Sequence, residues 1–218
     1  MSVHVSWLRR WLRGRSTTIR RPSRLRRFAL GLTLIAALVA VVVLVDRSSG
    51  WSSLSGERRA EAVARFSAEA SRISGKRVSV RCDEARDYVG AVQHADGVAV
   101  VGGDLAVLTP EICFDLYRLA FDGEVTGSRT GRAIAVLAHE AWHLRGEGDE
   151  ATTECYALQS GVTLGRRLGL DEDDARRLMR QQLVENELRG ADTLEYRLTS
   201  ECRNGGDLDL DPASDRFP

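Results

Sequence analysis

The centre of the sequence reads AIAVLAHEAWH from Ala133 to His143. Its first six residues, up to Ala138, would be apolar on every side of a helix, and an all-round apolar helix lies in a protein interior. Gly146 ends the pattern. We therefore predict a buried helix over about residues 132–145, with its chemically active side chains near the carboxyl end.

Two histidines and a glutamate stand at that end of the helix. His139 and His143 are four residues apart and so share one helix face, where two imidazoles can bind one metal ion. Glu140 stands beside the first imidazole, where it can take a proton from water. Zinc lowers the pKa of bound water to about 7 and polarises a carbonyl group. We predict Zn²⁺ as the cofactor, His139 and His143 as ligands and Glu140 as general base; a third protein ligand is needed.

An acidic pair follows at the start of the next predicted helix, over about residues 149–168. Glu150 and Glu154 are also four residues apart and face one way. One of them can bind the metal while the other accepts a hydrogen bond from a ligand histidine and fixes its tautomer. The alternative is a solvated acidic first turn, which the helix dipole favours.

With these residues the sequence resembles the gluzincin class of zinc metallopeptidases. In that class a His-Glu-x-x-His helix precedes a second helix that carries a ligand Glu and, four residues later, an Asp or Asn. The pair Glu150 and Glu154 is similar, with Glu where Asp is usual, and Tyr156 with Ala157 resembles the aromatic-Ala pair of some members. The resemblance covers about residues 133–160. It implies a zincin-like fold and peptidase activity.

The resemblance also implies a role for each matching residue. His139, His143 and Glu150 would hold the zinc, Glu140 would be the general base, and Glu154 would accept a hydrogen bond from a ligand histidine without binding the metal itself. The separation between His143 and Glu150 is short for the class, so Glu154 stays open as an alternative third ligand.

Two further positions bear on the resemblance. Trp142 occupies a position that is often Gly, which changes the packing beneath the site. Zincin-type sites often contain a Tyr or His donor for the oxyanion, and Tyr196 and His94 are the candidates here. Nothing in their spacing selects either one.

Helical and strand patterns flank this centre on both sides. Turn signals and periodicity predict helices over Glu57–Ser74, over Glu111–Phe121 and after Asp171, a short strand near 78–80, and a hairpin of residues 97–101 and 105–108. The fold class is therefore α+β, helix-rich with a small sheet. The expected domain spans residues 57–203, and residues 204–218, rich in Gly, Asp and Pro, form a flexible tail.

The amino-terminal part has a different composition. Residues 1–27 hold nine of the 31 basic residues and no acidic one, which leaves 22 basic against 31 acidic residues, a formal charge of −9, in the remainder. An acidic body repels phosphates and excludes nucleic acid as its partner. Residues 28–45 form an uncharged apolar run long enough for a membrane helix.

This asymmetry predicts how the chain sits in a membrane. Arginines before the apolar run place residues 1–27 in the cytoplasm and the remainder outside the cell membrane, as a single-pass protein. The competing interpretation is a cleaved signal peptide, but no small-x-small site follows at Leu44-Val45-Asp46. An uncleaved anchor over 28–45, followed by a Ser/Gly-containing linker over 46–56, is therefore expected.

All four cysteines lie in the expected exported part: Cys82, Cys113, Cys155 and Cys202. Thiols outside the cytoplasm are readily oxidised, so an even number predicts two disulfides. Three pairings are possible, and the pairing of chain neighbours, Cys82–Cys113 and Cys155–Cys202, is favoured because each bond would tie a flank to the helical centre.

Two functions are consistent with these features. The first is a membrane-anchored, extracytoplasmic zinc peptidase that acts on a peptide or protein substrate. The alternative is a non-catalytic cell-envelope protein that keeps a zincin-like fold and a structural metal. The two differ in whether Glu140 has a use, and the sequence indicates neither a cleavage specificity nor an oligomeric state.

Overall fold

The computed structural model describes residues 31–39, 50–85, 87–88, 96–189 and 198–218. The chain divides into two compact units, Met1–Val45 and Asp46–Pro218. In the first unit residues 31–39 are helical. Among the described residues, no helix is both long and apolar enough to cross a membrane. The anchor expected over 28–45 lies only partly within the described residues and stays a prediction.

The second unit confirms the predicted helix-rich α+β class. Its described elements, in chain order, are η1 (Trp51–Ser53), α2 (Gly56–Ser74), β1 (Ser79–Cys82), β2 (Gly97–Ala99), β3 (Leu105–Leu108), α3 (Pro110–Tyr117), η3 (Arg118–Asp122), α4 (Ser128–Arg145), α5 (Glu150–Leu168) and α6 (Glu172–Arg189). Side-chain caps begin several of these helices: Ser55 before α2, Thr109 before α3 and Asp149 before α5 accept hydrogen bonds from the first turn.

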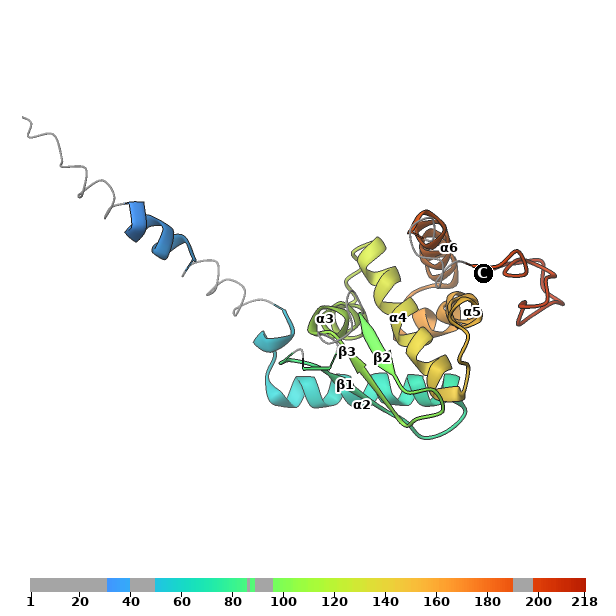
Figure 1. Cartoon of the computed structure of the whole chain (residues 1–218), viewed down its shortest axis with the longest axis horizontal. Coiled ribbons are helices and arrows are strands. Elements are labelled where there is room, and N and C mark those ends of the chain that lie inside the picture. The colour runs from blue at the N-terminus through green and yellow to red at the C-terminus, as the bar shows by residue number, and fades with distance from the viewer. Residues whose placement is uncertain (1–30, 40–49, 86, 89–95, 190–197) are drawn as a thin grey trace, which may run out of the picture. The chain divides into compact units, whose positions relative to one another are not determined.

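The small sheet has the strand order β1-β3-β2. β2 and β3 form the predicted antiparallel hairpin, with Val98 opposite Val107. β1 pairs with β3 in parallel, with Val80 opposite Ala106. This order leaves β2 at an edge of the sheet, on the side where α4 passes (Figure 1).

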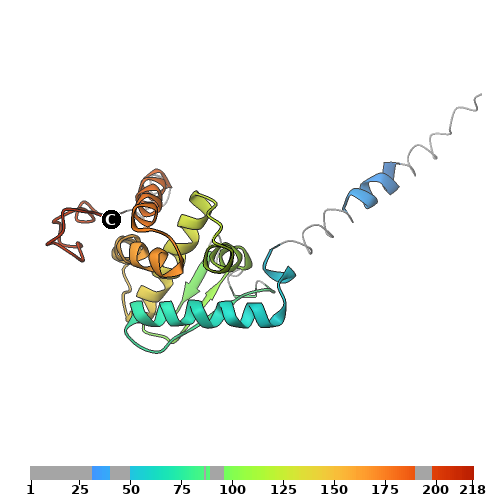
Figure 2. The same ribbon diagram turned by 180° about the vertical axis from the view of Figure 1, so that it is seen from behind.

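Helix α4 lies at the centre of the unit. It packs against α2, α3 and the sheet on one side and against α5 and α6 on the other (Figure 1), and the view from behind shows the same order of layers (Figure 2). Its residues Ile134 and Leu137 are completely buried, as are Phe66 from α2 and Leu158 from α5. Helix α4 is thus covered by neighbours on all sides, which explains why its first half is apolar on every side.

Helix α4 begins at Ser128, about one turn before the predicted start. The extra turn is polar, but its side chains have partners. Arg129 forms a two-pronged ion pair with Asp115 at 2.6 and 3.1 Å, and the Ser128 hydroxyl donates to Glu185 at 2.7 Å. Tertiary contacts of this kind extend a helix beyond the limits that local sequence preference indicates.

Two disulfides tie the unit together. Cys82 at the end of β1 is bonded to Cys113 in α3, and Cys155 in α5 is bonded to Cys202 in the carboxyl-terminal segment. The Cα atoms of the two pairs are 6.1 and 5.6 Å apart, within the usual range. These are the two pairings that the order of the cysteines favours.

The carboxyl-terminal segment, residues 198–218, is attached to α5 by hydrogen bonds as well as by the disulfide. The amide of Gln159 donates to the Leu208 carbonyl at 2.8 Å, and the Leu210 N–H donates to the Gln159 side-chain carbonyl at 2.7 Å. The tail expected at 204–218 thus has partners on α5, while its flexibility stays a prediction.

Candidate metal centre

A short, fixed turn brings the end of α4 against the start of α5. Gly146 has a φ of 118°, a left-handed conformation that favours glycine. The Glu147 carboxylate accepts hydrogen bonds from the N–H groups of Gly148 and Asp149, at 2.9 and 3.0 Å. Asp149 in turn accepts from the Thr152 N–H at 2.8 Å and caps α5. The last turn of α4 and the first turn of α5 therefore hold their side chains in a set relation.

Three of these side chains converge on one point. The Nε2 atoms of His139 and His143 are 2.9 Å apart. Glu150 places one carboxylate oxygen 3.1 Å from His139 Nε2 and the other 3.4 Å from His143 Nε2. Bonds of about 2.0–2.1 Å to a tetrahedral zinc ion put the ligand atoms about 3.3–3.4 Å from one another. Within the described part of the chain, these three residues form the group that could hold a metal ion.

The hydrogen-bond partners of the two Nδ1 atoms determine the tautomers of His139 and His143. His139 Nδ1 lies 3.1 Å from Oε2 of Glu154, and His143 Nδ1 lies 2.8 Å from the carbonyl oxygen of Glu147. Both partners accept hydrogen bonds, so each Nδ1 carries a proton, and a ring that is neutral, as a metal-bound histidine is, presents the lone pair of Nε2 at the point where the two rings meet. Two such lone pairs and a carboxylate repel one another unless protons or a metal ion lie between them. The donor set therefore fits a metal ion.

The charges of these groups are strongly coupled. Burial lowers the pKa of His139, but hydrogen bonds to Glu150 and Glu154 outweigh burial and raise that pKa to about 10. Burial likewise opposes the Glu150 and Glu147 hydrogen bonds at His143, whose pKa is raised above its ordinary value. Hydrogen bonds from both histidines hold the pKa of Glu150 well below its usual range. The surrounding carboxylates thus favour a positive charge at the point where the three side chains meet.

Glu140 is a buried carboxyl group beside this point. Its side chain is on α4 next to His139, and the residue is only 5% exposed. Among the described residues, its Oε2 atom is buried without a hydrogen-bond partner. Burial raises the pKa of Glu140 to about 7, against the opposing charges of His139 and His143. A carboxyl group with such a pKa can both accept and release a proton near neutral pH.

A glycine on β2 makes room for this carboxyl group. A Cβ atom at Gly97 would lie 2.8 Å from Oε1 and 2.9 Å from Cγ of Glu140. Only glycine allows that approach without a shift of one side chain. The edge strand therefore leaves the space that the Glu140 carboxyl group occupies.

Trp142 packs between the two helices beneath the site. Its indole N–H donates to the Ser160 hydroxyl on α5 at 2.9 Å, and its ring lies 4.7 Å from that of Tyr156. The large ring at a position where the gluzincin pattern often has Gly is thus accommodated by α5, one turn beyond the acidic pair.

The structure places the predicted site residues as follows. It brings together His139, His143 and Glu150, and it sets Glu154 on the far side of the His139 ring rather than among the converging atoms. The two candidate oxyanion donors, Tyr196 and His94, lie outside the described residues. The sequence did not indicate that Gly97 and the Glu147 carbonyl belong to the site, because neither position stands out by residue type or spacing.

Comparison of the chain with protein-family models, with curated proteins and with solved structures found no match.

Proposed function

We propose that the protein is a zinc-dependent peptidase. One observation carries the proposal: two imidazole nitrogens and a carboxylate converge within 2.9–3.4 Å, with a buried carboxyl group beside them. His139, His143 and Glu150 would hold the zinc. The ion would supply a polarised carbonyl group and a water of lowered pKa.

The remaining steps belong to side chains of the chain itself. Glu140 takes the proton of the attacking water and returns it to the leaving amine. Gly97 on the edge strand leaves room for the Glu140 side chain. Glu154 accepts the Nδ1–H of His139, which directs the other ring nitrogen to the metal.

The experiment that tests this function measures zinc and hydrolysis together. The full chain, purified in detergent, is expected to contain about one zinc per molecule and to cleave some members of a mixed peptide library. A chelator should stop cleavage, and added zinc should restore it. A preparation without zinc, or one whose cleavage survives complete removal of metal, would contradict the proposal.

We further propose that the chain is anchored in the cell membrane by residues 28–45, with the second unit outside. The nine arginines before the apolar run and the two disulfides after it support this orientation. A reporter enzyme that is active only outside the cytoplasm is expected to be active when it is fused after Pro218. A reporter that is active only in the cytoplasm should show no activity at the same position. The reverse result would overturn the orientation.

A further inference from the structure

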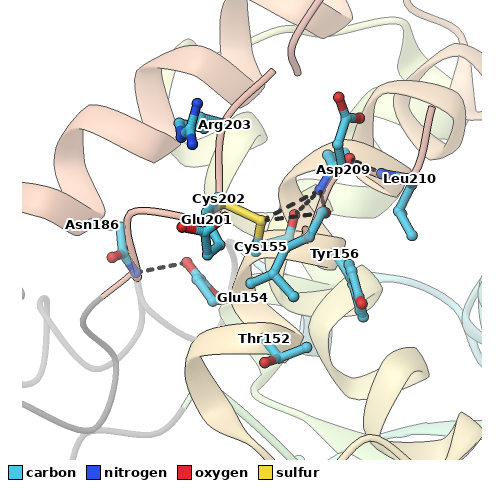
Figure 3. The surroundings of a disulfide bond; sticks show 12 residues. Thr152, Glu154, Cys155, Tyr156, Asn186, Glu201, Cys202, Arg203, Asp209 and Leu210 are labelled. Atoms are coloured by element: carbon cyan, nitrogen blue, oxygen red, sulfur yellow. Dashed lines mark hydrogen bonds between the residues drawn. A yellow bond between two sulfur atoms is a disulfide. The ribbon is translucent and has the colours of Figure 1, made fainter. Parts of the chain in front are cut away.

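A buried asparagine on α6 reaches the metal centre through Glu154. Asn186 is 5% exposed, and its Nδ2–H donates to Oε1 of Glu154 at 2.8 Å. Figure 3 shows the Asn186 amide directed at this carboxylate from the neighbouring helix. Asn186 follows Glu154 by 32 residues, so no local pattern connects the two.

The carboxylate of Glu154 is thereby held at both oxygens. Oε1 accepts from Asn186, and Oε2 lies 3.1 Å from Nδ1 of His139. From these contacts we infer that Asn186 is a positioning residue of the metal centre, acting through Glu154 on the ring of His139. The inference rests on the proposed zinc site.

A disulfide, and not Asn186, holds the main chain next to Glu154. The next residue, Cys155, is bonded to Cys202, and Figure 3 shows this disulfide on the side of Glu154 away from Asn186. The disulfide fixes α5 itself, whereas Asn186 fixes the direction of one side chain on it. Loss of the amide would leave Oε1 of Glu154, whose side chain is only 14% exposed, without that donor, and the carboxylate would turn to find another. The His139 ring would then lose its orientation while α5 stays in place.

A matched control lies one turn earlier on α6. Gln182 is 2% exposed, and its amide donates to the Ser128 carbonyl at 3.3 Å and to Glu185 at 3.0 Å. It is thus a buried amide on the same helix whose hydrogen bonds go to α4 and to its own helix. Replacing it disturbs the packing of α6 without removing the donor to Glu154.

The test compares Asn186→Leu with Gln182→Leu in the full chain. Zinc affinity is measured by competition with a chromophoric chelator, and the visible absorption of the Co²⁺-loaded protein reports ligand geometry. Removing an outer partner of a metal ligand costs about 10–100-fold in metal affinity. We expect N186L to lose about 10-fold, the lower end of that range, and to shift the cobalt bands, whereas Q182L keeps both at the wild-type values. Thermal unfolding of the metal-free proteins shows whether both variants fold. If N186L does not fold, Asn186→Asp replaces it in the test, because aspartate keeps the size of the side chain but at pH 8 has no donor.

Each outcome decides between the two proposals. If the wild-type chain takes up neither zinc nor cobalt, the metal centre is wrong and the role of Asn186 falls with it. If the wild type binds metal and N186L and N186D match Q182L in affinity and spectrum, the positioning role is overturned while the metal centre stands.

Discussion

Replacing Glu140 by Gln is expected to abolish peptide hydrolysis while the zinc content stays at the wild-type level. A glutamine fills the same space but cannot take a proton, and loss of a general base lowers the rate by about 10²–10⁴-fold. The metal is retained because His139, His143 and Glu150 are unchanged. The measurement is the initial rate of peptide cleavage together with zinc content, with Glu61→Gln on the exposed face of α2 as the matched control.

The neighbouring glycine gives a second way to test the same residue. In Gly97→Ala the new methyl group meets Glu140 at 2.8–2.9 Å and pushes the carboxyl group from its place. A displacement of about 1 Å in a catalytic group can cost about 100-fold in rate. Gly56→Ala at the start of α2, where nothing lies within 4 Å of the added carbon, is the control.

These two variants also separate an enzyme from a structural metal protein. A structural zinc has no use for Glu140 or for the glycine that makes room for it. If E140Q and G97A keep their metal and cleave as fast as the wild type, Glu140 is not the base. If the wild type holds zinc but cleaves nothing, the alternative of a non-catalytic envelope protein is favoured.

Removing any one of the three converging side chains is expected to remove stoichiometric zinc. His139→Ala and His143→Ala each delete a ligand atom from a set that is held within 2.9–3.4 Å, and Glu150→Gln replaces its charged ligand by a neutral amide. The loss should exceed the factor of about 10–100 expected for Glu154→Gln, which removes an outer partner. Zinc content after dialysis against a weak chelator ranks the four variants, and Glu61→Gln again gives the baseline.

The ranking of the two glutamates is the sharpest part of this prediction. The sequence leaves Glu150 and Glu154 open as third ligand because both face the same way on α5. The structure places Glu150 at the Nε2 atoms and Glu154 at Nδ1 of His139. If Glu154→Gln empties the site and Glu150→Gln retains zinc, these roles are reversed.

The sequence predicts the pairs of site residues that lie on one helix, but it does not predict the residues that packing brings to the site from other elements. Residues four apart on a helix share a face, so the pairing of His139 with His143, and of Glu150 with Glu154, follows from spacing alone. Gly97 and Asn186 enter the site from β2 and α6, and their positions depend on how those elements pack. A buried Asn in a helix, or a Gly at the start of a short strand, has no periodic signal of its own.

The fold divides in the same way. Caps, glycines and apolar periodicity predict most of the helices and the β2–β3 hairpin to within a few residues. The parallel pairing of β1 with β3 brings together segments about 26 residues apart (Ser79 with Leu105), and only the packed structure shows it. The early start of α4 at Ser128 likewise depends on Asp115 and Glu185, which lie on other helices.

The two disulfides close separate loops, one from Cys82 to Cys113 and one from Cys155 to Cys202. Helix α4 (Ser128–Arg145) belongs to neither loop, so the element at the centre of the unit has no covalent cross-link of its own. A zinc ion held by α4 and by Glu150 of α5 would supply the missing connection, because a metal that binds only the folded state stabilises it. Removal of the metal should therefore destabilise α4 first. The exchange of its backbone amide hydrogens should accelerate before that of the cross-linked segments.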